Sequence, residues 1–193
     1  MTLGGVILAA GGARRFGAVK QLAELDGRPL MCHAMEALIA VPRIERRVVV
    51  LGSHAEEIRA HVDVVLDRWE VVECPDWEEG LSASLRAAIR ALRECDAVLV
   101  LLADQPGVTP EVIAQIAGEA DRGVKAARAV YDGEPGHPVL ICRDLYDDVL
   151  ALTGDTGARE LLADVHADQI EVGGLARPHD VDTPEQLEAY SQP

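Results

Sequence analysis

The sequence feature that most constrains the fold is an unbroken apolar run at residues 97–103, Ala-Val-Leu-Val-Leu-Leu-Ala. A strand whose two faces are both apolar must be covered on both sides, as at the centre of a parallel sheet. Shorter runs predict further strands at 6–10, 47–51, 70–74, 125–131, 139–142 and 170–172. We therefore expect a buried sheet rather than one with a solvated face.

Segments with helical periodicity alternate with these strands. They cover residues 30–40 (preceded by Pro29), 55–61 and 81–92, with further helices starting at Thr109-Pro110, at Asp144, near Thr156 and at Pro184. Ser53 followed by Glu56 predicts a capping box for the second helix, and 132–136 is predicted to be a substrate-side loop. This alternation predicts a three-layer α/β/α Rossmann-like sandwich with a mostly parallel central sheet, formed by one domain over 1–193.

Charge and cysteine spacing argue against several classes of partner and of metal or redox site. The formal net charge is -15, so the chain would repel nucleic acid and anionic membranes. Its four cysteines form no C-x-x-C pair, which gives no support for a zinc knuckle or a redox motif. The apolar run at 6–10 is too short for a membrane span or a signal peptide. We expect a soluble cytoplasmic protein with reduced cysteines and no nucleic-acid or membrane partner.

A loop rich in glycine and arginine follows the first predicted strand. Gly11, Gly12 and Gly17 let backbone amides approach an anion, while Arg15 and Lys20 supply positive charge. Arg14 completes this small basic cluster, which suits a phosphorylated small molecule better than a polymer. The alternative is a surface loop whose arginines are solvated.

Two other glycine motifs are excluded in this loop. A Walker loop needs Lys and Ser or Thr directly after its last glycine, and Ala18 and Val19 stand there instead. The dinucleotide fingerprint G-x-G-x-x-G is absent, which argues against a dinucleotide oxidoreductase.

Two acidic segments are candidate metal ligands. Asp104 follows the central predicted strand, at the edge where open α/β sheets bind ligands, and Mg²⁺ prefers carboxylates together with phosphate oxygens. Asp180 and Asp182 precede a predicted helix. On residue chemistry alone, Asp104 could simply cap a turn before Pro106, and the other two acids could belong to an N-terminal cap.

Taken together, these segments resemble the MobA-like nucleotidyltransferase superfamily, of the nucleotide-diphospho-sugar transferase type. The resemblance is strongest to its molybdenum cofactor cytidylyltransferase branch. The family signature L-A-A-G-x-S-x-R-M-G-x-x-K is matched at Leu8, Ala9, Ala10, Gly11, Arg15, Gly17 and Lys20. Further matches at 80–85, 103–106, 136–138, 154–159 and 180–184 follow the family's order and span nearly the whole chain.

The resemblance implies a role for each matched segment. Arg15, Lys20 and Asp104 would be catalytic. The nucleotide would be bound by Leu8, Ala9, Ala10, Gly11, Gly12, Gly17, Lys20, Gly80, Ser82 and Ser84. Asp104 would ligate Mg²⁺ with Asp182 as the second ligand, and Asp180 stays open as its substitute. The acceptor side would be lined by His137, Asp155 and Arg159.

The implied reaction is transfer of CMP from CTP to the phosphate of molybdopterin or molybdenum cofactor, with release of pyrophosphate. A molybdenum hydroxylase would then receive the product. Ala13, Phe16 and Cys74 depart from the family pattern, and the departure at Cys74 weakens the expectation of cytosine most. Three alternatives stay open: a sister enzyme using GTP, one using another phosphorylated acceptor, and a non-catalytic maturation partner.

Overall fold

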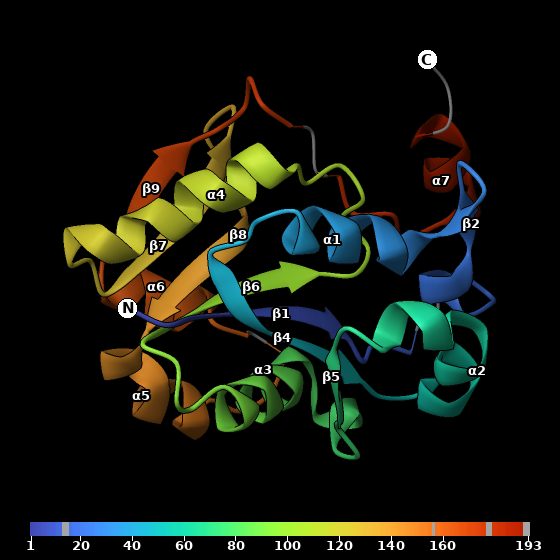
Figure 1. Cartoon of the computed structure of the whole chain (residues 1–193), viewed down its shortest axis with the longest axis horizontal. Coiled ribbons are helices and arrows are strands. Elements are labelled where there is room, and N and C mark those ends of the chain that lie inside the picture. Colours follow the sequence, from blue (N-terminus) through green and yellow to red (C-terminus); the bar gives the residue numbers. More distant parts are fainter. Residues whose placement is uncertain (13–15, 156, 177–178, 191–193) are drawn as a thin grey trace.

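A seven-stranded sheet runs through the centre of the computed structural model, which describes residues 1–12, 16–155, 157–176 and 179–190. Its spatial order is β5-β4-β1-β6-β8-β7-β9 (Figure 1). The strands are β1 (Leu3–Ala9), β4 (Ile44–Leu51), β5 (Glu70–Glu73), β6 (Ala97–Leu102), β7 (Ala126–Tyr131), β8 (Glu134–Cys142) and β9 (Asp168–Glu171). β8 pairs antiparallel with both β6 and β7, and the other pairings in this sheet are parallel. The predicted mostly parallel sheet is confirmed.

Helices cover both faces of this sheet, which confirms the three-layer prediction. The helices are α1 (Leu30–Ile39), α2 (Ala55–Leu66), α3 (Leu81–Ala91), α4 (Pro110–Gly118), α5 (Tyr146–Ala151), α6 (Arg159–Asp164) and α7 (Pro184–Tyr190). Buried residues of α1, α2 and α4 form one core, and those of α3, α5 and α6 form the other. Figure 1 shows α1 and α4 side by side on one face of the sheet, and α3 and α5 on the opposite face.

Alternation along β1 explains why two cores form. Ile7 and Ala9 belong to the core under α1 and α4, whereas Val6 and Leu8 belong to the core under α3. Successive side chains of a strand point to opposite faces, so an unbroken apolar strand needs cover on both. β1 and β6 are therefore held rigidly at the centre of the molecule.

A third, smaller cluster lies beside the main sheet. It includes the hairpin of β2 (Glu24–Leu25) and β3 (Arg28–Pro29), which sequence periodicity did not predict. Its buried members are Leu25, Leu30 and Val181, against which Phe16, Leu187 and Tyr190 pack. The cluster thereby ties the segment that follows the glycine loop to the C-terminal segment before and within α7.

The capping box predicted for α2 is wrong. α2 begins at Ala55, its N-cap residue is His54, and no side chain caps it. The Ser53 hydroxyl instead donates to the Gly11 carbonyl at 3.4 Å. The helix also continues beyond the predicted end at 61, through a non-helical Val62 to Leu66.

The loop predicted at 132–136 is also wrong for most of its length. Tyr131 pairs with Glu134, so residues 134–136 belong to β8 and only Asp132 and Gly133 form the turn. Their φ angles of 51° and 86° are both positive, as a two-residue hairpin turn of type I′ requires. The Glu171 carboxylate accepts hydrogen bonds from both of their amides, which fixes the turn.

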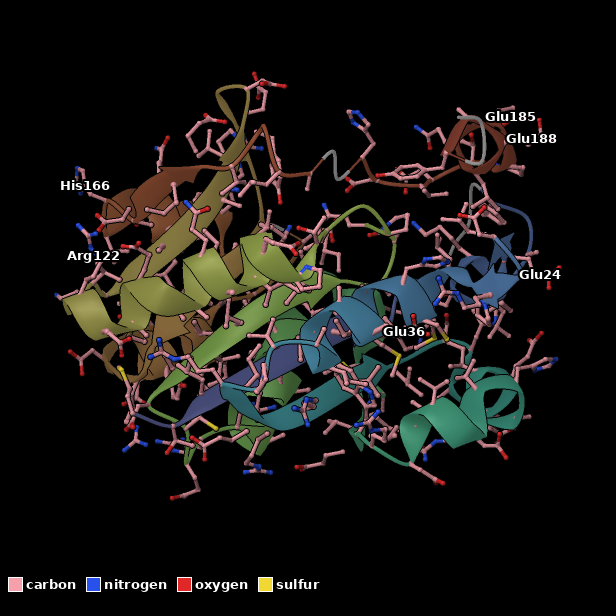
Figure 2. The ribbon with its side chains drawn as sticks, turned by 45° about the horizontal axis from the view of Figure 1, so that its top comes forward. Glu24, Glu36, Arg122, His166, Glu185 and Glu188 are labelled. Atoms are coloured by element: carbon pink, nitrogen blue, oxygen red, sulfur yellow. The ribbon has the colours of Figure 1, made fainter. Side chains whose placement is uncertain are left out.

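Charged side chains cover the surface of the molecule. Figure 2 shows Glu24, Glu185 and Glu188 at the end formed by β2 and α7, with Arg122 and His166 at the opposite end, and all five are exposed. Among the described residues, no helix has the length and apolarity needed to cross a bilayer.

Candidate functional site

The candidate site lies where the central strands β1 and β6 end. The segment that follows β6 bonds directly to the end of β1, because the Ala103 amide donates to the Leu8 carbonyl at 3.1 Å. A cavity of about 580 Å³ opens there, and we call it the first cavity. Its lining includes Leu8, Ala10, Gly11, Gly12, Lys20, Gly80, Ser84, Asp104, Asp155 and Asp182. The location follows the rule that open α/β sheets bind ligands beyond the carboxyl ends of their strands.

Lys20 lies between two carboxylates in this cavity. Its Nζ is 2.7 Å from Asp104 Oδ2 and 2.9 Å from Asp182 Oδ1. The three side chains are mostly buried, with exposed fractions of 12% for Lys20, 24% for Asp104 and 29% for Asp182. Charge-assisted hydrogen bonds of this length are among the stronger side-chain contacts. One cation and two anions therefore form a compact polar group at the cavity wall.

Burial and charge shift the pKa values of this group. Burial alone would lower the pKa of Lys20, but its hydrogen bonds and charge contacts with Asp104 and Asp182 outweigh burial, so the pKa is raised. Burial raises the pKa of Asp104, the Lys20 ammonium opposes that shift, and the nearby Asp180 carboxylate adds to it. Lys20 is therefore held in its charged form, beside a carboxylate that is costly to leave ionised without a second cation.

The carboxylates fit a divalent cation. Asp104 Oδ1 is buried and has no hydrogen-bond partner within the described part of the chain. An ionised oxygen buried in this way needs a partner, and carboxylate oxygens are hard ligands of the kind that Mg²⁺ and Mn²⁺ prefer. The described residues contain no cluster of three or more possible ligand side chains. Asp104 and Asp182 are therefore the two carboxylates of this cavity wall that could supply oxygen ligands to such an ion.

Gln21 holds the start of the glycine loop in shape. Its Nε2 donates to the carbonyls of Ala9 and Gly11, both at 3.0 Å, and its side chain is almost fully buried. These carbonyls belong to the last residue of β1 and to the loop just beyond it, so the side chain supplies hydrogen bonds where regular strand pairing stops. Gln21 thus fixes the backbone that leads from β1 into the loop.

Space around the loop glycines differs from one to the next. A Cβ on Gly11 or Gly17 would meet nothing within 4 Å, whereas one on Gly12 would lie 3.0 Å from the Trp77 ring. Gly17 has a φ of 75°, which favours glycine. Arg15, together with residues 13 and 14, lies outside the described residues, so its predicted role stays a prediction.

Gly80 brings α3 against the 154–155 loop. Its φ is 110°, and an added Cβ would lie 2.8 Å from the Gly154 carbonyl oxygen and from the Asp155 Cα. The Asp155 carboxylate accepts a hydrogen bond from the Leu81 amide at 3.2 Å. Asp155 therefore lines the first cavity and also binds the first residue of α3. The sequence resemblance placed it on the acceptor side.

The two serines of α3 face different surroundings. Ser84 lines the first cavity. Ser82 is fully buried, and its hydroxyl donates to the Gly154 carbonyl at 2.5 Å, so it holds the loop rather than facing the cavity. Residues two apart on a helix point in different directions, which the shared motif could not reveal.

A second cavity of about 370 Å³ adjoins the first, and Leu8 and Leu81 line both. His137 and Arg159 line the second cavity, as does Arg128 of β7, which sequence reasoning missed. Burial, and then the charge of Arg128, lower the pKa of His137 to about 4, so its ring is neutral at pH 7.

Backbone contacts hold the His137 segment in place. The Tyr131 hydroxyl donates to the His137 carbonyl at 2.6 Å. The Tyr131 ring also lies so close to Gly136 that an added Cβ would meet it at 2.8 Å. The Gly-His-Pro motif thus positions an imidazole at the cavity.

The structure brings most of the predicted site residues together, in two neighbouring groups. Gly11, Gly12, Lys20, Asp104 and Asp182 share the first cavity, while His137 and Arg159 share the second. Asp180 accepts a hydrogen bond from Gln105 Nε2 at 2.6 Å and does not line the first cavity.

Sequence reasoning missed Gln21, Trp77 and Arg128. Gln21 directly follows the matched Lys20, which was the only available signal. Trp77 and Arg128 stand in segments that no motif marked.

Comparison with known proteins gives a family match and relatives with different named activities. Residues 5–170 match the model of the MobA-like NTP transferase domain. Nicotine blue oxidoreductase of Paenarthrobacter nicotinovorans is 32% identical over 193 residues, covering 95% of this chain and 93% of that protein. A probable molybdenum cofactor guanylyltransferase of Pyrococcus horikoshii is 34% identical over 129 residues, covering 66% of this chain and 61% of that protein.

Solved structures with the same fold include Rv0371c of Mycobacterium tuberculosis H37Rv. It superposes with a TM-score of 0.88 at 27% identity, covering 98% of this chain and 97% of the other. A complex of Rv0371c with manganese superposes with a TM-score of 0.83 at 25% identity, covering 98% of both chains.

Proposed function

The chain belongs to the MobA-like NTP transferase family of nucleotidyltransferases, and we propose that it transfers CMP from CTP to the phosphate of a molybdopterin-type acceptor. Pyrophosphate is the second product. The observation that carries this proposal is the contact of Lys20 with Asp104 and Asp182 beside the glycine loop. We also propose that residues 1–193 act as one nucleotidyltransferase domain, because the site draws on residues from Leu8 to Asp182.

In the proposed complex, the nucleotide occupies the first cavity. Amides of Gly11 and Gly12 approach its phosphates, and Ser84 and Gly80 lie toward the base or ribose. Asp104 and Asp182 would hold Mg²⁺, which when bound would neutralise phosphate charge and orient the triphosphate. The manganese complex of Rv0371c supports a divalent cation in this fold. Lys20, kept protonated by its two carboxylates, adds a fixed positive charge.

The reaction needs no general base. A phosphate monoester has its second pKa near ~6 and is mostly dianionic at neutral pH. One of its oxygens attacks the α-phosphorus of CTP; a new P–O bond forms, and the bond to the bridging oxygen of the β-phosphate breaks. The electron pair leaves with pyrophosphate, where Lys20 stabilises the developing charge. The residues thus act by positioning and by electrostatics.

CTP is the proposed donor, and GTP is the alternative that the guanylyltransferase relative supports. Purified protein would be mixed with Mg²⁺, molybdopterin and either CTP or GTP, and pyrophosphate release would be measured. We expect release with CTP that depends on both Mg²⁺ and molybdopterin. Release with GTP alone would overturn the choice of base. No release with either, despite nucleotide binding, would favour a non-catalytic partner of a molybdenum hydroxylase.

A second candidate function comes from the relative named nicotine blue oxidoreductase, which matches nearly the whole chain. The absence of the dinucleotide fingerprint argues against it. Nicotine blue and a reduced nicotinamide dinucleotide would be incubated with the protein, and loss of the dye's colour would be followed. Turnover of the dye without any pyrophosphate release from CTP or GTP would favour this candidate over the transferase.

A further inference from the structure

The second cavity is lined by two cationic side chains for which the described residues provide no ion pair. Arg128 extends from β7 and Arg159 begins α6, and both line this cavity. The two charges are close enough that Arg159, after burial, lowers the pKa of Arg128. Two like charges that face one cavity repel each other, so their arrangement calls for an anion between them.

Neither arginine has an ion-pair partner among the described residues, unlike Arg43, which pairs with Asp121, and Arg86, which pairs with Glu79. Arg128 Nε is buried and has no hydrogen-bond acceptor in the described part of the chain. A buried donor on a charged group is costly when it is unmatched, and a planar guanidinium suits the oxygens of a phosphate. Glu134 lines the same cavity but is exposed and forms no ion pair with either arginine.

We propose that Arg128 and Arg159 together form a clamp for a phosphate monoester carried on an apolar ring system, with His137 beside it. This inference rests on the proposed function, since the phosphate would be the attacking group. It adds Arg128 and gives the chemical class of acceptor that the second cavity takes.

The rest of the lining agrees with such an acceptor. Leu85, Val100, Val139, Ile141 and Leu162 contribute an apolar floor, and each is at most 4% exposed. A volume of about 370 Å³ accommodates a phosphate together with a ring. The floor would contact the ring while the arginines bind the phosphate.

The two cavities differ in charge, as expected if one binds a metal-bound nucleotide and the other binds an anionic acceptor. The first cavity carries Lys20 and an excess of acids (Asp104, Asp155 and Asp182, with Glu78 and Glu79), a set that suits a nucleotide bound with a metal. The second cavity is mostly apolar, and its two arginines outnumber its one acid, Glu134, so it suits an anion without metal. Because Leu8 and Leu81 line both cavities, a phosphate on the arginines lies next to the nucleotide.

Titration calorimetry with phenyl phosphate, which has both the phosphate and a ring, tests the clamp on the full chain saturated with Mg-CTP. We expect Arg128→Gln and Arg159→Gln each to weaken phenyl phosphate binding by roughly tenfold or more, the scale for losing one charge-assisted contact. Mg-CTP binding should be unchanged in both variants. Arg128→Lys keeps the positive charge but loses the planar guanidinium that donates two parallel hydrogen bonds. It should therefore bind phenyl phosphate more tightly than Arg128→Gln and less tightly than the wild type.

The control is Arg93→Gln, because Arg93 is exposed, pairs with Asp147, and like Asp147 does not line the second cavity. Arg159 is also exposed, so its variant tests the clamp even if Arg128→Gln fails to fold. Wild-type affinity in the Arg159→Gln variant would overturn the proposal. So would competition between phenyl phosphate and Mg-CTP, because the arginines would then hold the nucleotide's phosphates. A failed pyrophosphate assay with an intact, arginine-dependent titration would refute the transferase reaction alone.

Discussion

Lys20 Nζ lies 2.9 Å from Asp182 Oδ1, although 162 residues separate the two along the chain. The same nitrogen lies 2.7 Å from Asp104 Oδ2, which follows the central strand β6. One ammonium thus connects the N-terminal glycine loop, the centre of the sheet and the C-terminal segment.

Replacing Lys20 by methionine should lower turnover by roughly 10²-fold or more, the usual scale for losing one electrostatic contact to a transition state. The methionine keeps an unbranched apolar stem and removes only the ammonium. Lys125→Met is a matched control, because Lys125 is the other lysine of the chain and is exposed. Steady-state pyrophosphate release measures both variants, and full activity in Lys20→Met would contradict the proposed role.

Asp104→Asn should abolish metal-dependent nucleotide binding, because an amide is a much weaker ligand for Mg²⁺ than a carboxylate. The variant retains the size of the side chain and removes its charge. Titration calorimetry with Mg-CTP gives the result directly, and Asp147→Asn, at a position 87% exposed, serves as control. An unchanged binding isotherm for Asp104→Asn would refute its assignment as a metal ligand.

Asp182 and Asp180 should respond differently to the same substitution. Asp182 contacts Lys20 in the first cavity, whereas Asp180 accepts a hydrogen bond from Gln105. Asp182→Asn should raise the Mg²⁺ concentration needed for half-maximal activity. Asp180→Asn still offers an acceptor to Gln105 and should leave that concentration unchanged. The opposite pattern would make Asp180 the second ligand.

Gly80→Ala should destabilise the protein by roughly 1–3 kcal/mol, since an alanine is strained at this φ and its Cβ would meet the 154–155 backbone. The KM for the nucleotide should also rise, because α3 would move at the cavity. Gly118→Ala is the control: its φ is -63° and its Cβ has open space. Thermal unfolding compares the two, and equal melting temperatures would show that the close approach at Gly80 is unimportant.

His137 should make stability depend on pH. Its pKa is about 4 in the folded chain, against an ordinary value of 6.5, because burial and then Arg128 disfavour the imidazolium. Between these values the unfolded chain binds more protons, so His137 contributes stability that is present above pH 6.5 and lost as the pH falls toward 4. The free energy of unfolding lost in this way is at most about 3 kcal/mol.

Denaturant unfolding from pH 7 to pH 4 measures this loss. His137→Gln should flatten the profile, while His166→Gln, at an exposed position, should retain it. A profile unaltered in His137→Gln would mean that the imidazole titrates normally in the folded protein.

Much of the fold could be predicted because the central strands are unambiguous. β6 is apolar on both faces, and only a sheet covered on both sides can bury it. β8 was underestimated because it starts with Glu134, Pro135 and Gly136, residue types common in turns. The β2 and β3 strands have two residues each, too few to show any period.

The candidate site could be predicted only as separate pieces. Motif spacing marked Lys20, Asp104 and Asp182 individually, but their convergence on one nitrogen depends on how the C-terminal segment folds back. Gln21 acts through its amide on the Ala9 and Gly11 carbonyls, a contact that no spacing rule predicts. Arg128 stands in an ordinary strand, and its significance comes from the cavity that it shares with Arg159.

The small cluster around Leu25, Leu30 and Val181 has a consequence for biosynthesis. During translation, β1, Lys20 and Asp104 leave the ribosome long before Asp182, so a nascent chain can assemble the central sheet while the second carboxylate is still missing. Asp182 reaches Lys20 only when the neighbouring Val181 packs against Leu25 in the hairpin of β2 and β3. Completion of the polar group thus has to wait until the segment that carries Asp182 has been made.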